Sequence, residues 1–191
     1  HPETFKVPTH KEIVLGIWPD KVVQSAKGLH QARIVPAFQA IVRRLAQRGA
    51  RSITTSCGFL VLLQKELQSA TTVPVVTSSL LLLPGLLRQQ AQVGVLTISA
   101  GKLGKEHLRS AGVPRERLAD VLVQGVDPAS EFATRILQNQ PTMDLAQAER
   151  DVVAAAVALK AQAPGLTTLV LECTNMPPYR ASIEAATGFK T

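Results

Sequence analysis

The chain contains two cysteines, Cys57 and Cys173, and each follows a stretch of residues that favours a β-strand. In an open parallel sheet, residues just beyond the carboxyl ends of the strands line the ligand crevice. Each cysteine also precedes a predicted helix, whose unpaired N–H groups favour a thiolate and lower the pKa of the thiol. The alternative is that both are small buried core residues, because free cysteine is often buried.

The spacing of glycines around the cysteines favours an active site over a purely structural role. Gly49 lies eight residues before Cys57, and Gly165 lies eight residues before Cys173. An offset of 116 residues therefore places the cysteines at equivalent positions of an internal duplication. Two residues that are the only cysteines of the chain and also occupy equivalent positions indicate a shared function.

The pattern of apolar residues predicts parallel α/β units on both sides of this duplication. Around Cys57 it predicts helices over 34–47 and 60–70 and strands over 51–56 and 73–76. Around Cys173 it predicts helices over 145–163 and 177–186 and a strand over 167–172. Between them we expect strands over 93–99 and 121–123 and helices over 105–111 and 130–137. The apolar run 80–87 is interpreted as buried structure.

Two lobes follow from this order, a first over 1–90 that carries Cys57 and a second over 91–191 that carries Cys173. The first lobe needs an opening strand, which either lies upstream of His1 or is replaced by 13–17. The second lobe stops where its next strand is expected. We therefore expect both chain ends to be incomplete.

Composition limits the class of protein and its partners. The 191 residues are 46% hydrophobic and 18% charged, which is typical of a soluble globular protein. The net charge is +7, but the basic residues are scattered and aromatic residues are few, so we expect no nucleic-acid partner. Without a signal peptide or a long apolar run, we expect no membrane association and a cytoplasmic location. The four histidines are dispersed, so no metal site is predicted.

Two symmetric lobes would place the thiols face to face across a cleft. One thiolate could remove a proton from a carbon atom while the opposing thiol delivers a proton, without a cofactor. Small polar residues near the cysteines and at the end of the strand 93–99 could hold a substrate carboxylate. These candidates are Thr55, Ser56, Thr97, Ser99, Thr174 and Asn175. Thr97 and Ser99 could equally cap the segment that follows them.

The segments ITTSCGFL (53–60) and LECTNMPPY (171–179) resemble the two cysteine motifs of the aspartate/glutamate racemase superfamily. More narrowly, they are similar to a bacterial branch called "aspartate/glutamate racemase family protein". This resemblance implies two Rossmann-like lobes with parallel sheets and pseudo-twofold symmetry, an active site in the cleft between them, chemistry independent of pyridoxal phosphate, and a homodimer. Gly58 and Phe59 stand where these racemases usually have Asn-Thr, and Asn175 stands where they often have His or Glu. We expect all three to contact the substrate.

The function expected from the residues and the resemblance is that of an isomerase without a cofactor. It would racemise or epimerise a small anionic substrate, an amino acid such as aspartate or glutamate or a dicarboxylate, with Cys57 and Cys173 as the catalytic acid and base. The alternatives are a hydantoin racemase, a maleate isomerase-like enzyme, or a protein that binds small anions without catalysis.

Glu172 directly precedes Cys173, and it either tunes the pKa of that thiol or points to the opposite side of the strand. His107 is interpreted as a surface residue.

Overall fold

The computed structural model describes residues 7–31 and 34–191 and contains two parallel sheets. In the smaller sheet β1 (Ile53–Thr54) pairs with β2 (Val75–Val76), and Ile53 lies opposite Val75. The larger sheet has the order β4–β3–β5, with β3 (Val93–Thr97) between β4 (Val121–Gly125) and β5 (Leu169–Leu171). The predicted mixed α/β fold with parallel sheets is therefore confirmed.

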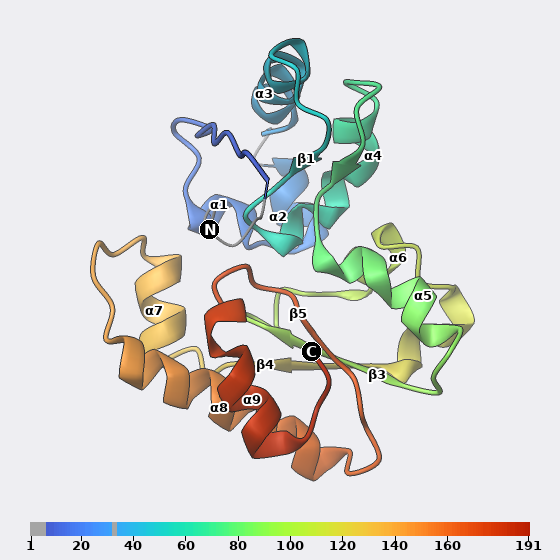
Figure 1. Ribbon diagram of the computed structural model, residues 1–191, viewed down its shortest axis with the longest axis vertical. Coiled ribbons are helices and arrows are strands. Elements are labelled where there is room, and N and C mark those ends of the chain that lie inside the picture. Colours follow the sequence, from blue (N-terminus) through green and yellow to red (C-terminus); the bar gives the residue numbers. More distant parts are fainter. Residues whose placement is uncertain (1–6, 32–33) are drawn as a thin grey trace.

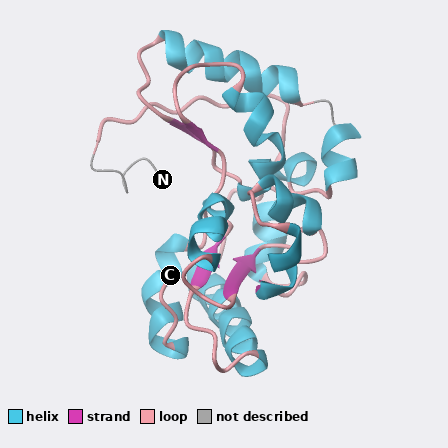
Figure 2. Ribbon diagram, turned by 90° about the vertical axis from the view of Figure 1, so that its right-hand side faces the viewer, coloured by secondary structure: helices cyan, strands magenta, loops and turns pink. Residues whose placement is uncertain are grey.

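The helices divide between these two sheets. Figure 1 shows α1 to α4 around the smaller sheet in its upper part, and α7, α8 and α9 beside the larger sheet below. Figure 2 shows the same arrangement from the side, with helices on both flanks of the larger sheet. The α-helices have the bounds α1 Pro19–Val22, α2 Ala26–Gln31, α3 Val35–Gln47, α4 Gln64–Gln68, α5 Leu83–Leu87, α6 Lys105–Ser110, α7 Glu131–Leu137, α8 Leu145–Gln162 and α9 Arg180–Thr187. Short 3₁₀ helices cover η2 Gly58–Leu63, η3 Ser79–Leu82, η4 Arg115–Asp120 and η5 Pro177–Tyr179.

The larger sheet is built around β3, in which all five residues are buried. Such a continuous apolar strand is typical of the centre of a parallel sheet that is covered on both faces. Helix α8 approaches this strand closely at Gly94, where an added Cβ would lie 2.8 Å from the Leu166 side chain and 3.0 Å from that of Leu159. Glycine at this position therefore allows the segment around α8 to cover the sheet.

Two clusters of buried apolar residues correspond to the two sheets. One surrounds the smaller sheet and includes Val42, Ile53 and Leu67. The other surrounds the larger sheet, and residues from η2, η3 and α5 also belong to it. Cys57 packs against both clusters. The boundary predicted near residue 90 and the pseudo-twofold symmetry stay predictions.

Several predicted elements have different bounds in the structure. The helix expected over 60–70 is divided into η2 and α4, and the strand expected over 51–56 is reduced to the two residues of β1. Residues 13–17 form no strand, so the suggestion that they replace an opening strand is wrong. The run 80–87 is buried at Leu80, Leu83 and Leu87, as predicted, while Leu82 is exposed. In the described ranges, no helix combines the length and the apolar character that a membrane span requires.

Candidate active site

Both cysteines follow the carboxyl ends of parallel strands, as the sequence predicts. Cys57 comes three residues after β1 and directly precedes η2, whereas Cys173 comes two residues after β5 and lies before η5. Cys57 is partly exposed, and Cys173 is 8% exposed. Neither cysteine forms a disulfide in the described part of the chain.

The two cysteine segments lie against each other although 116 residues separate the cysteines. The Thr174 hydroxyl donates a hydrogen bond of 2.7 Å to the carbonyl oxygen of Ser56. A second link joins the same regions, because the Ser79 hydroxyl donates to the carbonyl oxygen of Leu171 at 2.8 Å. These hydrogen bonds bring the segment that contains Cys57 and the segment that contains Cys173 together.

Glu172 turns its carboxyl group toward the segment of the other cysteine. Its side chain is only 2% exposed, and an added Cβ at Gly58 would lie 2.3 Å from Oε1. Oε2 accepts a hydrogen bond of 2.8 Å from the Thr97 hydroxyl. Oε1 has no hydrogen-bond partner among the described residues. Burial raises the pKa of Glu172 to about 7, although the bond from Thr97 acts in the opposite direction.

Both thiols resist ionisation in this environment. Burial raises the pKa of the Cys57 thiol well above its ordinary value, and the charge of Glu172 and the Cys173 thiol raise it further. Burial and Glu172 also raise the pKa of Cys173, to about 12. The backbone N–H groups of Phe59 and Leu60 act in the predicted direction at Cys57 but are outweighed. The prediction that helix N-termini give low thiol pKa values is wrong, because burial dominates.

The predicted substrate-binding residues fall into two groups. The side chains of the first group form hydrogen bonds or packing contacts within the protein. Thr55 donates to the carbonyl oxygen of Thr77 at 2.6 Å, and Phe59 is fully buried with its ring edge-on to His107. Thr97 bonds Glu172, as described above, and accepts a bond from the backbone N–H of Ser99 at 3.3 Å.

Members of the second group lie nearer the surface. Ser56 and Thr174 are exposed, whereas Ser99 and Asn175 are partly buried. The amide of Asn175 donates to Cys173 Sγ over 3.9 Å, and its backbone N–H also lowers the pKa of that thiol. Gly58 is buried because the Glu172 carboxyl covers it. The substrate-binding roles of all these residues stay predictions.

His107 is buried completely, so its interpretation as a surface residue is wrong. Its Nδ1 accepts a hydrogen bond from the Gly104 backbone N–H at 3.1 Å. Burial lowers the pKa of the imidazole, which favours the neutral ring. The sequence contains a signal for this position, because the helical period places His107 on the same face as the buried Ala111, four residues further on.

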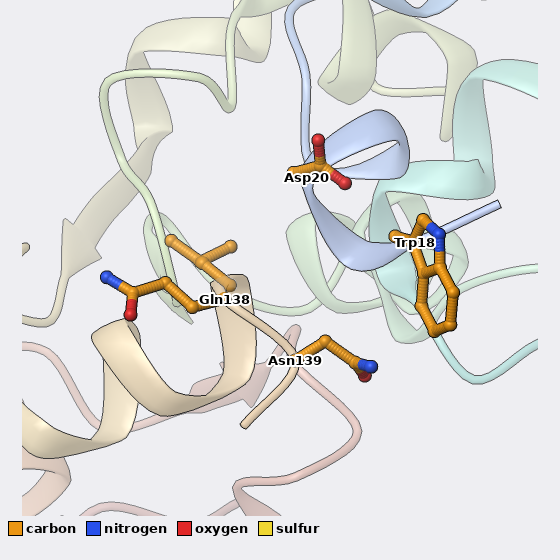
Figure 3. A pocket seen from close by; sticks show the side chains of 5 residues that line it. Trp18, Asp20, Gln138 and Asn139 are labelled. Carbon is orange, nitrogen blue, oxygen red and sulfur yellow. The ribbon is translucent and has the colours of Figure 1, made fainter. Parts of the chain in front are cut away.

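An open depression of about 470 Å³ lies apart from the cysteines, between the start of α1 and the end of α7. Figure 3 shows Trp18 and Asp20 on one side of it and Gln138 and Asn139 on the other. Leu137 completes the lining. Neither cysteine lines this depression, so it is separate from the candidate active site.

Comparison with known proteins gives two curated relatives, and both are named as dimethylsulfoniopropionate lyases. No known family profile matches the chain. Over 98% of its length, the chain is 30% identical to a dimethylsulfoniopropionate lyase from Durusdinium sp. clade D, of which it covers 62%. Over 97% of its length, it is 26% identical to dimethylsulfoniopropionate lyase 5 from Emiliania huxleyi (strain CCMP1516), of which it covers 38%. The chain thus spans less than two thirds of either relative.

Two solved structures with a similar fold are glutamate racemases. One, from Francisella tularensis in complex with D-glutamate, has a TM-score of 0.50 and 15% sequence identity, with 87% of this chain and 59% of that chain covered. The other, isoform RacE1 from Bacillus anthracis, has a TM-score of 0.51 and 20% identity, with 82% and 58% covered. The chain therefore shares its fold with these two glutamate racemases.

The expected activity requires correction. The sequence motifs led to an isomerase that racemises a small carboxylate, but the relatives that match nearly the whole chain are lyases. The racemases share only the fold at 15–20% identity. A shared fold does not imply a shared function. The lyase relatives therefore overturn the racemase prediction, which is wrong.

Proposed function

We propose that the chain is a lyase that eliminates a sulfide from a small carboxylate whose β-carbon bears a sulfonium group. Dimethylsulfoniopropionate is the substrate to test. The observation that carries this proposal is the 30% identity to a dimethylsulfoniopropionate lyase over 98% of the chain. Within the superfamily, we place the chain with such lyases and not with the bacterial branch that its motifs resemble.

The cysteine site supports the first step of this reaction. A thiolate at Cys57 or Cys173 removes a proton from the carbon next to the carboxylate. The electron pair of that C–H bond forms a double bond to the β-carbon, and the bond from the β-carbon to sulfur breaks. The sulfur keeps the bonding pair and leaves as neutral dimethyl sulfide, so it needs no proton from an acid. Acrylate remains, and the thiol then returns its proton to water.

The polar groups near the thiols suit the other end of the substrate. Removing a proton next to a carboxylate places negative charge on its oxygens, which hydrogen-bond donors stabilise. Ser56 and Asn175 lie close to the surface at the cysteine segments, and Ser99 follows the end of β3. These three are the donors that we propose for this role. Thr174 and Thr55 use their hydroxyl groups to hold the segments in place.

The same first step explains why a racemase motif can accompany lyase chemistry. Racemisation and β-elimination both begin when a base removes the proton next to a carboxylate. The outcome then depends on the substrate: an α-carbanion beside a β-sulfonium group expels the sulfide, whereas one without a leaving group is reprotonated. The residues around the thiols can therefore serve either reaction.

Product analysis tests this function. The purified chain is incubated with dimethylsulfoniopropionate, and proton NMR follows the vinyl signals of acrylate and the methyl signal of dimethyl sulfide. We expect the two products to form in equal amounts. If the substrate stays intact under conditions in which the protein is folded, the proposed function is wrong.

A further inference from the structure

One buried carboxyl group, that of Glu172, lies where the two cysteine segments meet. Glu172 is the chain neighbour of Cys173, and its Oε1 lies directly against Gly58, the chain neighbour of Cys57. Oε2 is held by the Thr97 hydroxyl at 2.8 Å, whereas Oε1 has no partner in the described part of the chain. This fixed carboxyl therefore touches the segments of both reactive groups.

Among the described residues, none gives Glu172 a compensating charge. The titratable groups on which its charge acts are the two thiols, and β3 contributes the Thr97 hydroxyl, which does not titrate. Glu172 takes part in none of the ion pairs formed by the described residues. A negative charge on its carboxyl therefore acts on both thiols with little screening.

We propose that Glu172 is a positioning residue that controls thiolate formation at Cys57 and Cys173. While its carboxyl is protonated, a thiol ionises beside a neutral group. Once the carboxyl is ionised, its charge opposes a second negative charge only one residue away. The three groups are coupled, so the site holds one negative charge more easily than two.

The consequence of this control for turnover rests on the proposed elimination, in which a thiolate is the base. At a pH well above 7, ionised Glu172 keeps the thiolate fraction below the level that a neutral side chain at position 172 would allow. Near pH 7 a fraction of the molecules carries a neutral Glu172, and in these molecules only burial, and not the charge of Glu172, opposes ionisation of a thiol. Glu172 touches no substrate in this scheme, since its carboxyl lies beneath the backbone of Gly58.

Thiol alkylation tests the proposal without any substrate. Iodoacetamide reacts with thiolates, so its rate reports ionisation. The rate at Cys57 is measured from about pH 6 to pH 9 in a Cys173→Ser chain, with and without Glu172→Gln. We expect the Gln variant to react about tenfold faster at about pH 8, as removal of one adjacent charge implies. With Glu172 present, a plot of the logarithm of the alkylation rate against pH should have a slope below one near pH 7, because the carboxyl ionises there and opposes ionisation of the thiol.

Glu116→Gln is the matched control, because it removes the same charge from an exposed carboxyl and should leave the profile unchanged. Circular dichroism checks folding. If Glu172→Gln does not fold, Thr97→Val takes its place: loss of the bond from Thr97 keeps Glu172 protonated to a higher pH and should speed alkylation at pH 7–8.

Identical alkylation profiles for the parent and the folded variant would overturn the role of Glu172. A chain that releases no dimethyl sulfide still gives a result in this assay, so failure of this inference and failure of the lyase function are distinguishable.

Discussion

The Oε1 atom of Glu172 occupies the space that a side chain at position 58 would need. A Cβ built on Gly58 would lie 2.3 Å from this oxygen and 2.6 Å from the Glu172 carbonyl oxygen. This contact gives a physical reason for the glycine that follows Cys57. The identities of residues 58 and 172 are therefore coupled, and together they bring the two cysteine segments into contact.

Gly58→Ala should destabilise the protein, because the added methyl group cannot fit beside the Glu172 carboxyl and carbonyl oxygens. We expect the free energy of unfolding in urea to fall by about 1–3 kcal/mol, as for other overpacked sites. Gly101→Ala is the control, since nothing lies within 4 Å of its added Cβ. Equal stability of the two variants would show that residues 58 and 172 are not tightly packed.

Glu172 should make stability depend on pH. Its pKa is about 7 in the folded chain and 4.5 ordinarily, so the folded state keeps the proton over a range in which the unfolded state loses it. Its contribution to stability is therefore fully present below about pH 4.5, falls as the pH rises, and is lost above about pH 7. The difference between these two pKa values corresponds to about 3 kcal/mol in the free energy of unfolding.

Glu172→Gln removes this titration. Urea unfolding at about pH 4.5 and pH 8 should show that the variant gains stability relative to wild type at the higher pH. The exposed Glu116→Gln should show no such change. A stability difference between wild type and Glu172→Gln that stays constant with pH would contradict the pKa assigned to Glu172.

Thr174→Val should reduce lyase activity more than stability. The change removes the hydrogen bond of 2.7 Å to Ser56 that joins the cysteine segments, and misplaced reacting groups lower rates strongly. We expect release of dimethyl sulfide to slow about tenfold, while the exposed site limits the loss in unfolding free energy to about 1 kcal/mol. Thr134→Val, which removes a hydroxyl bonded to Ser130 within the α7 region, should keep the wild-type rate. Equal rates for both variants would exclude an aligning role for Thr174.

The sequence predicts the position of the cysteines well because that position depends on local patterns. The apolar run at β3 and the helical period of α8 identify buried elements without knowledge of the tertiary structure. The glycines before the cysteines mark the ends of helices. Parallel strands then bring the residues after their carboxyl ends to one side of a sheet.

The electrostatics of the site could not be predicted in the same way. Helix N-termini favour thiolates, but the effect of burial on Cys57 and Cys173 depends on packing between segments 116 residues apart. Glu172 is unusual in the sequence because it is a charged residue directly after an apolar strand. Its bond to Thr97 and its contact with Gly58, however, exist only in the folded chain. The reaction itself was also beyond prediction, because removal of a proton next to a carboxylate is the first step of both racemisation and elimination.

A lyase site built on Cys57 and Cys173 is tested most directly by measuring the release of dimethyl sulfide. The rates are compared for the wild type, the two single cysteine variants and the double variant. Gas chromatography of the headspace over dimethylsulfoniopropionate gives the rates. We expect the wild-type chain to release dimethyl sulfide and the Cys57→Ser/Cys173→Ser chain to be slower by at least about 100-fold, the effect of losing a positioned base. The single variants identify which thiol is that base. No release by the wild type, or an undiminished rate in the double variant, would contradict a lyase site built on these cysteines.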